Sequence, residues 1–207
     1  MSHVSGVILA GGQSRRMGGS PKALIPFDGR PLVSYIVQRV TAVLPDCLVV
    51  TNSPELYAFL GLPMVGDAFP GGGSLGGIYS GLSAAPGDAA LCLACDMPFV
   101  SAGLLGHLAE RAGEADVVVP LAAGELQPLH AVYDKACLPA MERRLRAGRL
   151  KISGFFEEVR VLKVPDAEVS RFDAPELAFM NLNTPEEVAR ARETWAERAA
   201  SRGGERA

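Results

Sequence analysis

Apolar residues fall along this chain in two alternating patterns. Short apolar runs, rich in Val, Leu and Ala, lack the strict alternation of a half-exposed strand, so they predict strands covered on both faces. Longer segments between them carry apolar residues at helical spacing. The expected strands are residues 4–10, 47–52, 90–96 and 115–121, and the expected helices are residues 31–44, 74–85 and 101–113. This order predicts a Rossmann-like α/β fold, with a doubly wound, mainly parallel (mixed) sheet flanked by helices.

The second half of the chain is less regular. Residues 136–149 have the pattern of a helix and residues 159–165 that of a strand. A last helix is expected to begin at Thr184, where Glu187 three positions later completes a capping box. No repeat, linker-like tract or low-complexity segment interrupts the sequence. We therefore expect one domain over residues 1–195 and a frayed tail over residues 196–207.

Composition narrows the class of protein. Hydrophobic residues make up 48% of the 207 positions, which is enough for a substantial core. The net charge of −3 argues against general nucleic-acid binding, because that function uses a basic surface. The N-terminus has no basic leader, and no apolar run is long enough to span a bilayer. A cytoplasmic protein is expected.

Two of the four cysteines, Cys92 and Cys95, have the C-x-x-C spacing of metal and redox sites. They lie in an expected buried strand, however, and strand residues three apart point to opposite faces. The two sulfurs therefore cannot share a metal ion there. We expect the cysteines to be core residues.

Ligands of a doubly wound sheet bind beyond the carboxyl ends of its strands. The residues that follow the expected strands should therefore converge on one cleft; they are Ala10, Gly11, Gly12, Asn52, Asp96 and Gln127 to His130. Among them, Asp96 would be costly if it were buried without a partner. Coordination of Mg²⁺ suits this carboxylate better than capping the helix near Ser101.

Glycines and basic residues follow the first strand in the stretch LAGGQSRRMGGSPK, residues 9–22. Its spacing excludes a P-loop, because Pro21 precedes Lys22 and no Ser or Thr follows the lysine. It also excludes the dinucleotide-binding fingerprint, since the first two glycines are adjacent. A glycine backbone beside Ser14, Arg16 and Lys22 can still surround phosphate oxygens.

This stretch resembles the signature of the nucleotidyltransferases built on a glycosyltransferase-A-type fold, and most of all that of the molybdenum cofactor guanylyltransferases. Further matches follow in the family's order: TN at 51–52, GDAFPGGGSLGGIYSGL at 66–82, ACDMPF at 94–99, LQPLHAVY at 126–133 and NLNTPEE at 181–187. The resemblance covers nearly the whole chain. Pro21 and Ser74 depart from the family's pattern, which often has Asp and Pro there, so the path of the loop near Lys22 stays open.

The resemblance implies that the N-terminal half binds GTP. The residues implied at the triphosphate are Leu9, Ala10, Gly11, Gly12 and Lys22. Asn52 and Asp67 are implied to contact the guanine nucleotide, and Asp96 to bind both Mg²⁺ and nucleotide. Relatives that use CTP tend to have alanine at the position of Gly11, so the glycine here favours GTP.

The reaction implied by the resemblance transfers GMP from GTP to the terminal phosphate of molybdopterin, the molybdenum cofactor's pterin, and releases pyrophosphate. Its catalytic residues are expected to be Lys22, Asp96 and Arg16, with Mg²⁺ as the cofactor. A phosphate nucleophile is already anionic near neutral pH, so no side-chain base is needed.

The C-terminal half is expected to bind molybdopterin. The candidate contacts are Gln127, His130, Asn181 and Asn183, followed by Lys151 and Ser153. His130 suits a position in the core equally well. A turn before the last helix would also explain the two asparagines.

Two alternatives stay open. The first is an enzyme of the same fold with another base or acceptor, such as a CTP:molybdopterin cytidylyltransferase or a sugar-phosphate nucleotidyltransferase. The second is a nucleotide-binding protein without catalysis. Expected partners are GTP, molybdopterin and enzymes that insert or receive the cofactor; nucleic acid and membranes are not expected partners.

Overall fold

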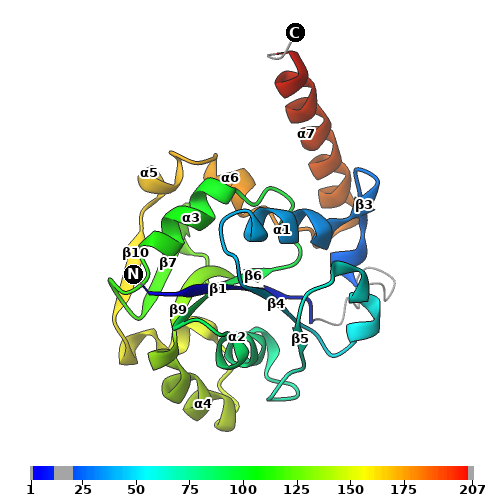
Figure 1. Cartoon of the computed structure of the whole chain (residues 1–207). Helices are drawn as coiled ribbons and strands as arrows, with labels where there is room; N and C mark the ends of the chain where they lie inside the picture. The colour runs from blue at the N-terminus through cyan, green and yellow to red at the C-terminus, as the bar shows by residue number, and fades with distance from the viewer. Residues whose placement is uncertain (1, 12–20, 205–207) are drawn as a thin grey trace.

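An eight-stranded sheet forms the centre of the structure, a computed structural model that describes residues 2–11 and 21–204 (Figure 1). The strand order is β10-β7-β9-β6-β1-β4-β5, and β8 pairs with β7. The strands are β1 (Val4–Leu9), β4 (Cys47–Val50), β5 (Met64–Val65), β6 (Ala89–Ala94), β7 (Val117–Ala122), β8 (Glu125–Leu126), β9 (His130–Asp134) and β10 (Val161–Val164). A separate two-stranded ribbon consists of β2 (Pro26–Phe27) and β3 (Arg30–Pro31).

Strand directions confirm the mixed, mainly parallel sheet. Strand β1 pairs in parallel with β4 and β6, β4 with β5, and β10 with β7. Strand β9 is reversed and pairs antiparallel with both β6 and β7. Because β9 runs backwards, its first residue, His130, lies at the edge where the parallel strands end.

Helices cover both faces of this sheet (Figure 1). They are α1 (Leu32–Thr41), α2 (Gly73–Ala84), α3 (Ala102–Glu110), α4 (Leu138–Arg146), α5 (Asp166–Val169), α6 (Pro175–Ala178) and α7 (Pro185–Gly204). Short 3-10 turns occupy Lys22–Leu24, Pro54–Leu56, Ala58–Leu60, Lys135–Cys137 and Ile152–Glu158. The capping box predicted for the last helix is present, with Glu187 N donating to Thr184 Oγ1 and Thr184 N to the Glu187 carboxylate.

Successive strand residues enter two different hydrophobic clusters, one on each face. Ile8 of β1 packs in the cluster under α1 and α3, and its neighbour Val7 packs in the cluster under α2 and α4. The same alternation separates the two spaced cysteines, because Cys92 belongs to the α2 cluster and Cys95 packs against the α1 cluster. Burial raises the pKa of Cys95 to about 12, so this thiol stays protonated at neutral pH.

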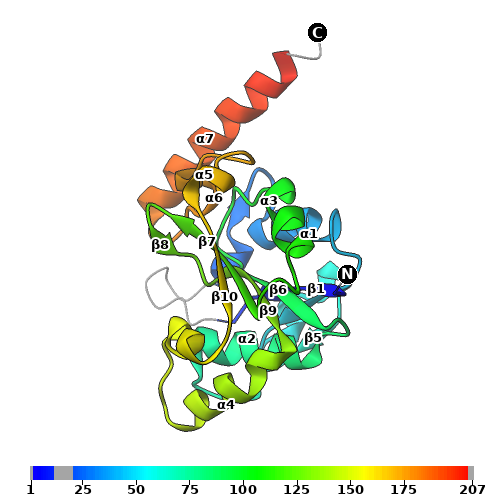
Figure 2. The ribbon, with the colours of Figure 1, turned by 90° about the vertical axis from the view of Figure 1, so that its left-hand side faces the viewer.

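Helix α7 packs against the body of the molecule along its first half, and Arg198 forms an ion pair with Asp173. Val188 and Ala191 are buried there, and the outer turns project beyond the body of the molecule (Figure 2). Residues 196–204, where the sequence predicts a frayed tail, continue this helix. Within the described ranges, no helix has both the length and the apolar composition needed to cross a membrane.

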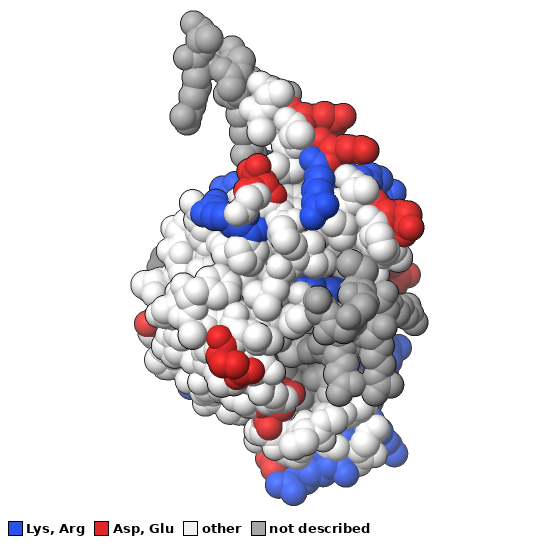
Figure 3. Space-filling model, turned by 90° about the vertical axis from the view of Figure 1, so that its right-hand side faces the viewer, with Lys and Arg blue, Asp and Glu red and all other residues white. Residues whose placement is uncertain are grey.

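Acidic and basic side chains are interspersed on the face shown in Figure 3. Among the side chains coloured there, Lys and Arg form small groups separated by Asp, Glu and uncharged surface. This distribution agrees with the slightly acidic net charge of −3.

Glycine lets helix α2 approach the sheet. A Cβ added at Gly81 would lie 2.3 Å from Val7 Cγ1 and 3.0 Å from Val50 Cγ2. Both valines are β-branched and buried, so neither can turn away at low cost. The close contact between α2 and strands β1 and β4 therefore depends on the missing side chain.

Gly81→Ala should lower the free energy of unfolding by about 1–3 kcal/mol, because the added methyl group overpacks this contact. Urea denaturation followed by circular dichroism measures the change. Gly77→Ala, one turn earlier in α2, is the matched control, since its Cβ would meet only Leu9 Cδ2 at 3.4 Å. The control should be neutral or more stable, as alanine favours helix. Equal stability of the two variants would contradict the packing argument.

Candidate active site at the carboxyl edge of the sheet

The carboxyl ends of β1, β4 and β6 lie next to one another and bring the expected nucleotide-binding residues to one edge. At the end of β1, Ala10 N donates to Val50 O at 2.9 Å, and Tyr57 Oη donates to Ala10 O at 3.3 Å. Leu9 and Ala10 are buried, whereas Gly11 is exposed. The backbone is therefore held firmly up to the point where the glycine loop begins.

Three segments far apart in the sequence meet at Lys22. Its Nζ donates to Asn183 Oδ1 at 2.6 Å and to Asp96 Oδ2 at 3.3 Å. The lysine and aspartate side chains are 21% and 19% exposed, so this ion pair is partly shielded from water. The backbone holds the C-terminal segment in place, because Leu182 N donates to Asp96 O at 2.9 Å.

Asp96 does not cap a helix. The N-cap of α3 is Ser101, whose Oγ accepts from Leu104 N. The Asp96 carboxylate instead faces Lys22 at the mouth of the site. In residues 2–11 and 21–204, no group of three or more His, Cys, Asp or Glu side chains is placed to hold a metal ion. A divalent cation at Asp96 would therefore take its other ligands from phosphate oxygens and water, as Mg²⁺ commonly does.

Asn52 and Asp67 form a reciprocal pair beyond β4 and β5. Asn52 Nδ2 donates to Asp67 Oδ2 at 3.0 Å, and Asp67 N donates back to Asn52 Oδ1 at 2.9 Å. Asn52 is exposed and Asp67 is half-buried. The pair presents carboxylate and amide groups in a fixed arrangement.

Nothing in the described fold requires glycine at position 11. A Cβ added to Gly11 would have no neighbouring atom within 4 Å, and its φ is not in the left-handed region. A ligand that occupies this space would explain the residue. The predicted roles of Gly12 and Arg16 lie outside the described residues and stay predictions.

The candidate acceptor contacts lie in different surroundings. Asn183 lies at Lys22, as described above. The exposed Asn181 donates from Nδ2 to Phe179 O at 3.2 Å, and half-buried Gln127 donates from Nε2 to Glu125 O at 3.4 Å. The two asparagines therefore share a segment, but only one of them joins the lysine and aspartate.

His130 was expected to follow a strand, but in the structure it begins one. It is the first residue of β9, its side chain has no exposed area, and its ring packs edge-on against Phe179. No described residue hydrogen bonds to either ring nitrogen. Burial lowers the pKa of His130 to about 3, so the ring is neutral at physiological pH. Of the two alternatives that the sequence left open for His130, the structure shows the core position. A direct contact between His130 and the pterin therefore has no support.

The contact between Lys22 and Asn183 was not predicted. The sequence placed the lysine at the triphosphate and the asparagine at the pterin, and the two residues are 161 positions apart. No periodic or spacing signal connects such distant positions. The contact nevertheless joins a residue expected at the triphosphate to a residue expected at the pterin.

Comparisons with known proteins found a matching family model, similar sequences and similar solved structures. Residues 6–161 match the family model of the MobA-like NTP transferase domain. A probable molybdenum cofactor guanylyltransferase from Pelotomaculum thermopropionicum is 38% identical over 93% of both chains. The molybdenum cofactor guanylyltransferase from Desulfosudis oleivorans is 36% identical over 92% of this chain and 95% of that protein. The molybdopterin-guanine dinucleotide biosynthesis protein A from Archaeoglobus fulgidus has a TM-score of 0.80 at 28% identity, covering 93% of this chain and 99% of that one.

Proposed function

Because this chain belongs to the MobA-like NTP transferase family, we propose that it transfers GMP from GTP to the terminal phosphate of molybdopterin. The products are the guanine dinucleotide form of the cofactor and pyrophosphate. The observation that carries the proposal is the meeting of Lys22, Asp96 and Asn183 at the edge where β1, β4 and β6 end.

The triphosphate lies along the end of β1 in this proposal. The backbone after Leu9 and Ala10 approaches it, and the Lys22 ammonium group neutralises part of its charge. Asp96 would hold Mg²⁺, which when bound would supply positive charge at the phosphates. In the free protein, the Lys22 ammonium group forms an ion pair with the Asp96 carboxylate. In the proposal, the triphosphate replaces Asp96 as the anionic partner of Lys22.

The Asn52 and Asp67 pair suits a guanine base. Guanine presents N–H donors and a carbonyl acceptor on its Watson–Crick edge, and these complement a carboxylate and an amide. Cytosine has a different order of donors and acceptors. The reciprocal hydrogen bonds hold both side chains before the nucleotide arrives, which lowers the entropy cost of binding.

In this proposal, the protein holds two anions next to each other, the acceptor phosphate and the triphosphate of GTP. The acceptor phosphate needs no base, so the protein aligns it with the α-phosphorus and offsets the repulsion between the two groups. Lys22 can both align the two groups and offset their repulsion, because its Nζ also donates a hydrogen bond to Asn183, a residue expected to contact the acceptor. Arg16, which the sequence suggests for the departing pyrophosphate, stays a prediction.

Pyrophosphate release tests the proposal directly. Purified protein is mixed with Mg²⁺, molybdopterin and one of GTP, ATP, CTP or UTP, and thermal shifts with each nucleotide are measured in parallel. We expect release with GTP and molybdopterin together, and stabilisation by GTP above the others. Pyrophosphate release with molybdopterin and CTP, but with none of the other nucleotides, would identify a cytidylyltransferase. GTP binding without pyrophosphate release would identify a nucleotide-binding protein without catalysis.

Gly11→Ala should raise the KM for GTP about tenfold, because the added methyl group enters space that the purine nucleotide occupies. The melting temperature of the free protein should stay unchanged, since the methyl group meets no described atom within 4 Å. Steady-state kinetics with GTP and CTP and a thermal melt without nucleotide measure both effects. An unchanged KM for GTP would remove Gly11 from the nucleotide site.

The cytoplasmic location and the partners that insert or receive the cofactor stay predictions from the sequence.

A further inference from the structure

A second concave region lies at the same edge of the sheet, beyond β7 and β10. This distal pocket has a volume of about 410 Å³ and is lined by Gly124, Leu126, Pro128, Lys151, Ser153 and Lys163. Lys151 precedes the 3-10 turn Ile152–Glu158, and Lys163 comes from β10. Lys163 was not recognised from the sequence, because it stands in a short strand without a motif.

Two lysines and one glutamate line the distal pocket, so the charge of its lining is positive. Among the described residues, neither the Lys151 nor the Lys163 ammonium group has a hydrogen bond or an ion pair, and Glu125 is the one acidic residue that lines the pocket. The chain has four lysines, and the other two are engaged: Lys22 in the site described above, and Lys135 with Ala85 O at 2.7 Å. An anionic ligand is the chemical complement of this pair.

The distal pocket lies within reach of the proposed reaction centre. Asp96 follows β6, and β9, β7 and β10 are the next three strands of the sheet. At about 4.8 Å between neighbouring strands, the pocket lies roughly 10–15 Å from Asp96. An acceptor whose phosphate lies at Asp96 can therefore extend along the sheet edge into the pocket.

One wall of the distal pocket is held rigidly. The β7–β8 turn contains Ala123 and Gly124, both with positive φ. The Asp166 carboxylate accepts hydrogen bonds from both turn amides, at 2.7 Å from Ala123 N and 3.3 Å from Gly124 N. The turn, β8 and α5 lie close together in Figure 2. The wall therefore keeps its shape before a ligand arrives.

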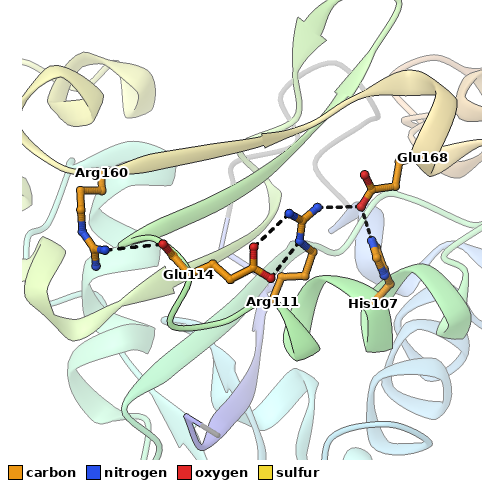
Figure 4. Close-up of polar contacts among 5 residues, drawn as sticks. All are labelled: His107, Arg111, Glu114, Arg160 and Glu168. Atoms are coloured by element: carbon orange, nitrogen blue, oxygen red, sulfur yellow. Dashed lines mark hydrogen bonds and ion pairs between the residues drawn. The ribbon is translucent and has the colours of Figure 1, made fainter.

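Helix α5, which supplies Asp166, is itself anchored to α3 (Figure 4). Glu168 accepts hydrogen bonds from His107 Nε2 at 2.5 Å and from Arg111 Nη1 at 2.6 Å. The hydrogen bond with His107 and the charge of Arg111 hold the pKa of Glu168 below its ordinary value. The Glu168 carboxylate therefore stays ionised at neutral pH.

We propose that Lys151 and Lys163 bind the anionic dithiolene end of molybdopterin, the end that carries molybdenum when the cofactor is loaded. Molybdopterin is anionic at its terminal phosphate and at its sulfur end, and the proposed reaction uses the phosphate at Lys22 and Asp96. The sulfur end is thus the anion left for the distal pocket. This inference rests on the proposed function and adds the residues that select the acceptor.

Charge removal in the distal pocket tests the inference. The variants are Lys151→Met, Lys163→Met and the double variant, with Arg149→Met as the matched control. Arg149 is exposed and two positions from Lys151, but it does not line the pocket. The readouts are the Kd for molybdopterin from its pterin fluorescence, the KM for acceptor and the KM for GTP, with both metal-free and molybdenum-loaded acceptor.

Each single variant should raise the Kd and the KM for acceptor about tenfold, as expected for a hydrogen bond to a charged group. The KM for GTP and the kcat at saturating acceptor should stay within about twofold of wild type, and so should every constant of the control. A rise that is seen with one acceptor form alone identifies the form that the two lysines select.

The outcomes separate this inference from the proposed function. If wild type makes product and the double variant keeps its acceptor constants, the lysine subsite is wrong and the function stands. An equal loss in the Arg149 control shows general charge attraction and also overturns the subsite. If wild type binds molybdopterin without making product, the proposed function fails and the Kd values alone decide the subsite. Absence of binding by wild type overturns both.

Discussion

Asp96→Asn should lower the kcat for guanylyl transfer by about 10²–10³-fold at saturating GTP and molybdopterin. The amide keeps the size of the side chain but loses the negative charge that would hold the metal and position the α-phosphate. Pyrophosphate release at a series of Mg²⁺ concentrations measures the loss. The rate should recover in part as the metal concentration rises, because the remaining ligands are phosphate oxygens and water.

A matched control for this result is Asp134→Asn. Asp134 also ends a strand, but β9 is reversed, so this carboxylate lies at the opposite edge of the sheet, where it caps the next turn through Ala136 N. It should keep wild-type kcat. An Asp96→Asn enzyme with more than about a third of the wild-type rate would show that this carboxylate does not hold the metal.

Lys22→Met should weaken GTP binding by about 10–100-fold and lower kcat as well. The variant loses the ammonium group that would face the triphosphate, and it also loses the hydrogen bonds to Asp96 and Asn183. Titration calorimetry with GTP in the absence of acceptor gives the affinity, and pyrophosphate release gives the rate.

Two further variants define the role of Lys22. Lys22→Arg keeps the positive charge and should recover part of the GTP affinity, but not the rate, because a guanidinium group is wider and placed differently. Lys135→Met removes a lysine whose Nζ donates to Ala85 O, away from the site, and should bind GTP like wild type. Unchanged GTP affinity in Lys22→Met would show that the triphosphate does not lie along the end of β1.

Two properties of the sequence allowed the sheet to be predicted. Strands β1, β4 and β6 are apolar on both faces, so their positions could be read from composition, and glycine, asparagine and aspartate followed them at one edge. Strand β9 was not expected because HAVYD mixes polar and apolar residues over five positions. Its reversed direction depends on pairing with β6 and β7, and no local preference encodes that pairing.

The arrangement of residues at the candidate site was predicted in part. Lys22 and Asp96 were chosen from motifs, and the structure places them 3.3 Å apart. The burial of His130 was not decided by its sequence neighbours. It follows from Phe179 of the C-terminal segment, which packs over the ring.

The sequence by itself determined the main buried strands and the helices between them, the glycine loop, the charged residues at the carboxyl edge and the family. These properties are local, since periodicity shows which face of an element is buried and spacing shows which residues follow a strand. The tertiary structure alone decided the reversal of β9, the contact of Lys22 with Asn183 and the position of Lys151 and Lys163 beside β7 and β8 in the distal pocket. The physical reason is that these contacts join segments far apart in the chain, and only the packing of the whole core selects which of them meet.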